Sequence, residues 1–382
     1  MEAVMKPLSI IKYYQNNRKR FLSVLISVTL SVILLYTVQM VIGSSFRLGH
    51  NLYVEPKKYF STISPKGEVL NRSIITTIEH TSGVERVIPC IFDSTSIRAG
   101  IGSNYSATIY SIESEEMTKM MELLDLKVKS GRLPVAGNEI ILHKQVAANK
   151  GLKIGDRIGR MISKEESLPG VYRVVGILDG EYILSFAPIK HYILTYHLPY
   201  EYIYGGIIFP KNGALDEMNQ ALESMVPSNY QINTINTERA WLKISEGKVN
   251  LFITLVCTFI ILIVSSCIGF LCYIYFTQRR SEFGLLWAIG YSRQKVINRA
   301  FAEINGINLL GYVLGVLLSI LVGFLLNITY FIPIGDSLDI IDIRYMLGAA
   351  CSPLFVTLFS LIPIWRMLKK LDPISIIDGS TL

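Results

Sequence analysis

The chain has 382 residues, of which 51% are hydrophobic and 18% are charged, and its formal net charge is +7. Soluble globular proteins carry about 25% charged residues, so this composition argues against an ordinary soluble domain. Low charge with high hydrophobicity also excludes disorder, collagen and coiled coil as the main architecture. Five cysteines in a chain of this length exclude a disulfide scaffold.

Four uncharged runs account for the hydrophobicity, and each is long enough for the ~20 residues that a helix needs to cross a bilayer. Pro333 and Gly335 are expected to end the third helix near Ile328. The first run could be a signal peptide, but its apolar stretch exceeds the ~7–15 residues of such a segment and no A-x-A site follows, so we expect an uncleaved anchor. The predicted spans are residues 21–43, 251–276, 304–328 and 345–365.

Lysine and arginine predict the orientation of these spans, because cytoplasmic loops carry an excess of them. The segments 1–20, 277–299 and 366–382 together hold thirteen lysines and arginines against four acidic residues. We expect them to be a cytoplasmic amphipathic segment, a cytoplasmic loop and a cytoplasmic tail. Residues 44–248 are nearly balanced and residues 329–344 are acidic, so both are expected outside the plasma membrane. The basic excess is then a topology signal, and nucleic acid is not needed as a partner.

The exterior segment is long enough for two small domains. Apolar stretches of helical and strand-like periodicity alternate along it, separated by turn signals such as the Gly-Arg-Leu-Pro run at 131–134. This pattern predicts an α-helical membrane protein with four transmembrane helices and a large α+β extracytoplasmic domain between the first two. The expected helices are 71–80, 115–124, 146–152 and 214–225, and the expected strands are 84–90, 107–112, 139–142, 153–158, 172–178, 204–209 and 230–235.

A helical pattern begins near Thr237, the expected N-cap, and runs into the second span. A continuous helix from Thr237 to Phe276 would be about 60 Å long, which exceeds the thickness of the membrane, so its outer half would be a rigid stalk. The alternative is a helix broken at Gly247.

The loop between the second and third spans contains a short amphipathic segment. Phe283, Leu286 and Trp287 give it an apolar face, and Gly290 ends it. Because so short a loop cannot cover this face alone, we expect the face to lie on the membrane surface or in a partner's groove.

These residues resemble the FtsX-like permease family, in which a basic-Ser-Glu-x-Gly-x-x-x-Ala-x-Gly-x-Ser pattern forms a coupling helix, here at 280–292. Glu303, Gly311 and Gly315 resemble the family's Glu-then-glycine pattern, and residues 362–374 resemble its C-terminal signature. The exterior segment resembles the MacB-type core domain at residues 71–89, 131–134, 138–141, 153–156 and 172–176.

The resemblance implies the permease subunit of an ATP-binding cassette exporter that works by mechanotransmission and expels a peptide, lipid-like or other amphipathic substrate. It implies a separate ABC-type ATPase subunit, a second permease copy as homodimer or related heterodimer, and the option of a membrane-fusion or adaptor protein. The sequence has no G-x-x-x-x-G-K-[ST] loop. We therefore expect the chain not to be an enzyme and to bind no cofactor itself, leaving ATP and Mg²⁺ to the partner ATPase.

The expected contact with the ATPase is the short amphipathic helix, whose aromatic rings would enter a groove on the partner while the neighbouring charges fix its orientation. The residues assigned to this role are Arg279, Arg280, Glu282, Phe283, Leu286, Trp287 and Gly290. A rival interpretation is an FtsX-like signalling scaffold that activates an extracytoplasmic hydrolase or sensor without transport. The large exterior segment favours export.

Small residues recur at every fourth position of the third span, which allows close packing of helices in lipid. This stripe consists of Gly311, Gly315, Ser319 and Gly323, and the sequence leaves open whether it packs within one chain or between two copies. Glu303 is expected to pair with Arg299, one turn earlier. The histidines lack metal-ligand spacing, and Met117, Met120 and Met121 are expected in the core.

Overall fold

The computed structural model describes residues 14, 17–67, 69–70, 72–100, 103–135, 137–164, 166–195, 197, 204–225 and 229–370. The chain divides into a helical unit, formed by residues 1–40, 249–325 and 339–382, and a second unit, formed by residues 41–248 and 326–338. Most of the expected cytoplasmic segment 1–20 and the end of the expected tail, 371–382, lie outside the described residues.

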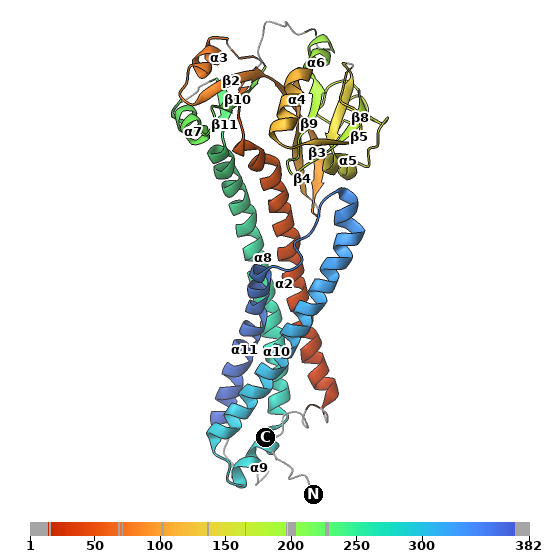
Figure 1. Cartoon of the computed structure of the whole chain (residues 1–382). Helices are drawn as coiled ribbons and strands as arrows, with labels where there is room; N and C mark the ends of the chain where they lie inside the picture. The colour runs from red at the N-terminus through yellow and green to blue at the C-terminus, as the bar shows by residue number, and fades with distance from the viewer. Residues whose placement is uncertain are drawn as a thin grey trace. The chain divides into compact units, whose positions relative to one another are not determined.

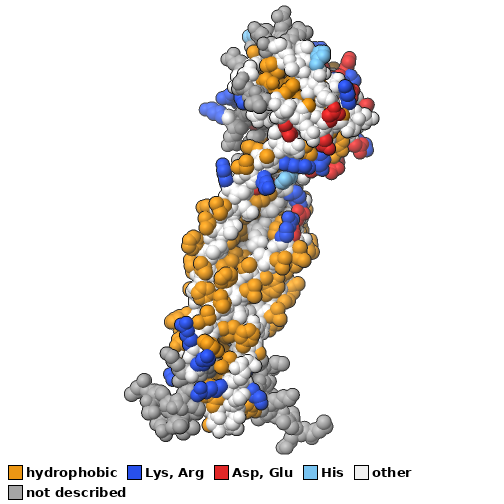
Figure 2. Space-filling model, turned by 90° about the vertical axis from the view of Figure 1, so that its left-hand side faces the viewer, with side chains coloured by type: hydrophobic (Ala, Val, Ile, Leu, Met, Phe, Trp, Pro, Cys, Tyr) orange, Lys and Arg blue, Asp and Glu red, His pale blue; other side chains and the backbone are white. Residues whose placement is uncertain are grey.

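Four helices are long and apolar enough to cross a membrane, judged by length and composition over the described residues. They are α2 (Arg18–Tyr53), α8 (Ile235–Thr277), α10 (Arg293–Leu326) and α11 (Ile343–Lys370), and the short α9 (Arg280–Ala288) joins α8 to α10 (Figure 1). Large apolar side chains such as Leu30, Phe259, Leu317 and Leu354 are 59–67% exposed on them. Figure 2 shows such side chains covering much of the visible face of the helical part, as expected for a surface in contact with lipid.

The third long helix ends close to where the sequence predicts. Regular α-helix stops at Leu326, and a π-helical segment, η2 (Asn327–Phe331), and a 3₁₀ turn, η3 (Ile332–Ile334), carry the chain on to Gly335. Gly335 has a φ of +76°, a left-handed conformation that favours glycine, and this residue closes the helical run.

The second unit contains two β-sheets. The smaller sheet is antiparallel, with the strand order β11-β1-β10-β2. Its strands are β1 (Ser61–Pro65), β2 (Val84–Pro89), β10 (Gly206–Pro210) and β11 (Tyr230–Asn233). The helices α3 (Arg72–Glu79) and α7 (Leu215–Ser224) place Ile78, Met218 and Leu222 in a common core with Ile63 and Ile208 of the strands. Helices on one side of an antiparallel sheet are typical of α+β folds.

The larger sheet is mixed, with the strand order β3-β4-β9-β6-β8-β5 and β7 paired to β8. Its core contains Met117, Met120 and Met121 on the buried face of α4, as predicted. The strands are β3 (Ile91–Ala99), β4 (Ser103–Ile112), β5 (Lys127–Gly131), β6 (Glu139–His143), β7 (Arg157–Ile158), β8 (Tyr172–Asp179) and β9 (Ser185–Pro188), and the helices are α4 (Ser114–Leu123), α5 (Lys144–Lys150) and α6 (Ile189–Thr195). The two sheets with their helices confirm the predicted α+β domain between the first two long helices.

The long second helix is continuous, because α8 runs from Ile235 to Thr277 without a break at Gly247. The predicted N-cap is wrong by one turn. Oγ1 of Thr234 accepts a hydrogen bond from N–H of Thr237 at 3.2 Å, and Oγ1 of Thr237 accepts one from N–H of Thr234 at 2.8 Å. Thr234 is therefore the cap, and Thr237 occupies the position that Glu or Gln fills in a capping box.

Candidate functional site

The short helix α9 packs its aromatic residues into the helical unit's own core. Phe283 is 1% exposed and Trp287 is 9% exposed, in a cluster that includes Phe276 of α8 and Val296 of α10. The rings of Phe276 and Phe283 are stacked, with centroids 5.8 Å apart and planes 6° apart. Burying aromatic side chains of this size contributes several kcal/mol, by order of magnitude, to holding α9 against α8 and α10.

A buried ion-pair network lies beside the stacked rings. Nη1 of Arg279 donates to Oε2 of Glu303 at 2.8 Å, and both side chains are only 3% exposed. Nε of Arg279 also donates to Oε2 of Glu282 at 2.9 Å. The predicted pair between Arg299 and Glu303 forms as well, at 3.2 Å. Two arginines thus share one buried carboxylate, and the pair of Arg279 with Glu303 joins the N-cap of α9 to the first part of α10.

The guanidinium of Arg279 also covers the stacked rings. Its carbon lies 5.5 Å from the centroid of Phe276 and 5.0 Å from that of Phe283. A desolvated cation over aromatic faces is worth about 2 kcal/mol. Arg279 is therefore the residue that connects the apolar and the ionic parts of this joint.

These positions correct two expectations from the sequence. The pattern predicts that the rings of Phe283 and Trp287 enter a groove on a separate ATPase, but they are already buried within this chain. It also predicts that Arg279 orients a partner, and Arg279 instead lies buried on Glu303. The physical reason is that α8 and α10 supply enough apolar surface to cover that face of α9, together with a carboxylate to neutralise the arginine.

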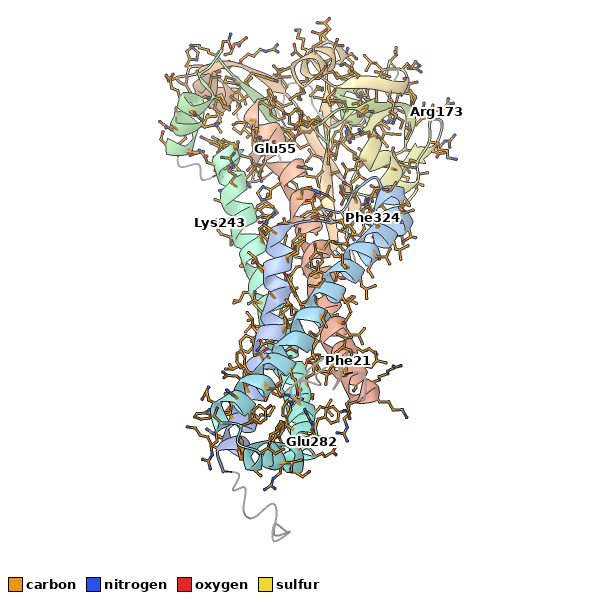
Figure 3. The ribbon with its side chains drawn as sticks, turned by 60° about the horizontal axis from the view of Figure 1, so that its bottom comes forward. Phe21, Glu55, Arg173, Lys243, Glu282 and Phe324 are labelled. Atoms are coloured by element: carbon orange, nitrogen blue, oxygen red, sulfur yellow. The ribbon has the colours of Figure 1, made fainter. Side chains whose placement is uncertain are left out.

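The opposite face of α9 is also apolar and is exposed. Leu285 is 61% exposed and Ile289 is 66% exposed, one helical turn apart. Glu282, labelled in Figure 3, lies one turn before Leu285, with its side chain 57% exposed. Leu286 and Arg280 are half-buried. The exposed surface of α9 thus includes Glu282, Leu285 and Ile289, which we call the outer face.

Gly290 ends α9 as predicted from its residue type. Its φ of +99° lies in the region that favours glycine, and its N–H donates to the carbonyl of Trp287 at 2.9 Å. The N–H of Tyr291 then donates to the carbonyl of Leu286 at 3.1 Å. This turn reverses the chain before α10 begins at Arg293.

The small-residue stripe of α10 is buried against α2 of the same chain. A Cβ on Gly311 would stand 2.8 Å from Val28, and one on Gly315 would stand 2.6 Å from Val32. Gly323 faces Met40 in the same way, and Oγ of Ser319 donates to the carbonyl of Gly315 at 2.7 Å. The sequence leaves open whether the stripe packs within one chain or between two copies. In the structure it packs within one chain.

Other polar contacts that were not predicted connect helices within this unit. Asn308, 3% exposed on α10, donates from Nδ2 to Oγ1 of Thr357 at 2.7 Å. Oγ of Ser31 and Oγ of Ser352 are 2.5 Å apart. Polar residues within a long apolar run are the sequence signal for such contacts, because a hydroxyl or amide in lipid needs a partner. In the described part of the chain, no three His, Cys, Asp or Glu side chains gather as a metal site requires.

The site just described lies within a segment that matches a known family. Residues 254–371 match the family described as FtsX-like permease C-terminal. This segment is an FtsX-like permease domain. The FtsX-like domain contains most of α8, the whole of α9 and α10, and α11. The buried network around Arg279 and Glu303, the outer face and the small-residue stripe all belong to it.

Two solved structures resemble the part of the chain outside the FtsX-like domain. The periplasmic region of MacB from Actinobacillus actinomycetemcomitans is 16% identical over 49% of this chain and 94% of that chain, with a TM-score of 0.30. The extracellular domain of the noncanonic ABC-type transporter YknZ from Gram-positive bacteria is 14% identical over 46% of this chain and 98% of that chain, with a TM-score of 0.28. No curated protein matches this chain significantly.

Proposed function

We propose that this chain is the permease subunit of an ATP-binding cassette exporter of the mechanotransmission type. In this proposal a separate ATPase subunit holds ATP and Mg²⁺, and the chain works with a second permease copy. The exterior α+β domain expels a peptide, lipid-like or other amphipathic substrate. The termini and α9 lie in the cytoplasm, and the α+β domain lies outside, as the distribution of lysine and arginine suggests.

The observation that carries the proposal is that α9 has one face locked to the chain and one face open. Phe283, Trp287 and Arg279 fasten it to α8 and α10. Leu285 and Ile289 are left exposed on the outer face. A helix packed in this way can take up a force on its exposed face and transmit it to α8 and α10, against which its buried face is packed.

The continuous helix α8 could carry a motion of α9 along its length. It has 43 residues, or about 65 Å at 1.5 Å per residue, and its residues belong to both units of the chain. A motion of α9 would reach the first turn of α8, which directly follows strand β11 of the small sheet, without crossing a flexible loop. This length supports mechanical transmission.

The proposed ATPase contact is the outer face of α9. Exposed aliphatic side chains one turn apart suit an apolar groove, and the carboxylate of Glu282 would lie at the rim of the contact. Each central apolar anchor of an interface is worth about 2 kcal/mol, a factor of about 30 in affinity. Rim charges mainly affect the rate and register of association.

The test replaces Leu285 and Ile289 with aspartate in the tagged full-length chain, purified from its own cells in mild detergent. We expect ATP hydrolysis that co-purifies with the wild-type chain to fall at least tenfold in this variant, because two charges would enter an apolar contact. The matched control is Gln294→Asp, an exposed position in the first turn of α10, which should retain the hydrolysis. Full hydrolysis with Leu285→Asp/Ile289→Asp would contradict the proposed contact.

A second measurement separates export from the signalling alternative. Inverted vesicles that contain the chain with its co-purified ATPase should accumulate amphipathic peptide or lipid probes in an ATP-dependent way. The signalling scaffold is the correct function if the wild-type vesicles move no probe and the wild-type complex in detergent instead activates an added extracytoplasmic hydrolase in an ATP-dependent way, which the outer-face variant fails to do.

A further inference from the structure

A small cavity lies in the second unit, where residues of both sheets meet the ends of two long helices. Its volume is about 140 Å³. Residues from α2, from the turn η1 (Glu55–Lys58) and from the first turn of α8 line it, together with residues of β1, β3, β4 and β11. Glu55, labelled in Figure 3, marks η1. The lining residues are Leu52, Tyr53, Lys57, Thr62, Ser64, Phe92, Thr108, Tyr110, Asn233 and Glu238.

The cavity contains a buried cation. Lys57 is 6% exposed, and its ammonium donates to Oγ1 of Thr62 at 2.6 Å and lies 5.2 Å from the centroid of Phe60. Burial lowers the pKa of Lys57 to about 8, and the nearby charge of Glu238 opposes this shift. The amine is thus still mainly charged at neutral pH. An ammonium has three donors, and in the described part of the chain no carboxylate forms an ion pair with this one.

The acidic residue that lines the same cavity is Glu238, in the first turn of α8. Burial raises the pKa of this carboxyl, and the charge of Lys57 partly offsets the rise. Within the described residues the carboxylate of Glu238 has no hydrogen bond and no ion pair, although Lys57 lines the same cavity. One cavity therefore holds a cation and an anion that do not touch each other.

We propose that this cavity binds a small zwitterion, an α-amino acid of about the size of glycine, alanine or serine. The ligand's carboxylate would pair with Lys57 and its ammonium with Glu238, which satisfies both charges at once. Hydroxyls of Ser64 and Thr108 and the amide of Asn233 supply further polar partners. A cavity of about 150 Å³ holds a molecule as large as benzene, so the volume suits such an amino acid and excludes a long peptide.

Binding would join elements that the proposed export mechanism moves. Lys57 follows the end of α2, and Glu238 begins α8, so a ligand between them would fix the distance between the two helix ends within this unit. The site stands independently of the proposed transport function, because binding requires no ATPase and no substrate movement. It would act as a sensor of small amino acids on the α+β domain.

The test measures equilibrium binding of radiolabelled glycine, alanine and serine to the purified full-length chain in detergent. We expect saturable binding at micromolar to millimolar concentration. Lys57→Met and Glu238→Gln should each weaken it about tenfold or more, because each leaves one ligand charge unpaired in a buried site. The control Lys58→Met removes a neighbouring exposed lysine, whose partner is Glu55, and should bind normally.

Single-charge probes decide between a zwitterion site and simpler alternatives. Acetate and methylamine should bind at least about tenfold more weakly than alanine, because each satisfies only one wall. Equal binding of acetate and alanine would overturn the proposal in favour of a plain anion site. No saturable binding of any of the three amino acids to a chain with a cooperative melting transition would overturn it in favour of a water-filled cavity. Melting curves of both variants confirm that lost binding is not lost folding.

Discussion

The substitution Glu303→Gln gives the sharpest test of the joint that fastens α9. The side chain keeps its shape and one acceptor oxygen, so the change isolates the charge. Arg279 would then remain 3% exposed and would lose the buried carboxylate of Glu303, while it keeps the carboxylate of Glu282, whose side chain is 57% exposed. Arg299, with its side chain 11% exposed, would lose the same carboxylate.

Removing one partner of a buried ion pair costs about 3–5 kcal/mol, because the remaining charge is left in a medium that solvates it poorly. The acceptor oxygen that the new amide retains places Glu303→Gln near the lower end of that range. At roughly 2 °C per kcal/mol for a large chain, the melting temperature should fall by about 6 °C. The control Glu282→Gln removes an exposed partner of the same arginine and should cost at most about 1 kcal/mol.

The assay is the melting temperature of the full-length chain in one detergent, followed by tryptophan fluorescence and by aggregation. The double substitution Arg279→Met/Glu303→Leu should recover the part of the loss that comes from Arg279, because an apolar pair of similar volume replaces that buried ion pair at little cost. Equal melting temperatures for Glu303→Gln and Glu282→Gln would refute the reasoning, since they would mean that water reaches the network.

Three further predictions concern other parts of the chain. Gly315→Ala should destabilise the chain by about 1–3 kcal/mol, because the new Cβ would stand 2.6 Å from Val32. The control Gly306→Ala should be neutral or stabilising, because the only atom near its new Cβ among the described residues is the hydroxyl oxygen of Tyr14, at 3.7 Å. Both effects are measured by melting in detergent. Burial lowers the pKa of His143 to about 4, below its unfolded value of about 6.5. The contribution of the neutral imidazole to stability should therefore be complete above pH 6.5 and should decline by about 3 kcal/mol as the pH falls towards 4. His143→Asn should flatten this dependence when melting is measured at several pH values, and an unchanged slope would contradict the prediction. In a cysteine-free background, a membrane-impermeant thiol reagent on intact cells should label Val135→Cys, 81% exposed, but should label Ile289→Cys only after lysis, and the reverse would invert the topology.

The long helices and the exterior α+β domain could be predicted because their signals are local. An uncharged run of bilayer length permits few structures other than a helix. Four strands, β1, β3, β5 and β9, were not predicted, and the last two of them lack such a signal. Every residue of β5 is exposed, and three of its five residues are Lys127, Lys129 and Gly131, so it is an edge strand without an apolar face. β9 has only four residues, too few to show a period.

The N-cap of α8 shows a different limit. Thr234 and Thr237 are both good capping residues, three positions apart, and propensity does not choose between them. The structure uses both, since each hydroxyl accepts from the other's backbone N–H. Thr234 is the cap because strand β11 ends at Asn233, directly before it. The end of β11 is in turn set by its pairing with β1 in the sheet.

The same limit governs the candidate site. On α9, Phe283 and Trp287 mark one apolar stripe and Leu285 and Ile289 mark another, so helical periodicity alone does not decide which stripe faces inward. Glu303 decides it, from a position 24 residues after Arg279 in the sequence, because the arginine can be buried only where that carboxylate meets it. Because Arg279 is buried there, the aromatic stripe of Phe283 and Trp287 next to it is buried in the core as well. This leaves the aliphatic stripe exposed. Substitutions at the aromatic rings should therefore report on folding of the joint, whereas substitutions at Leu285 and Ile289 should report on the proposed ATPase contact.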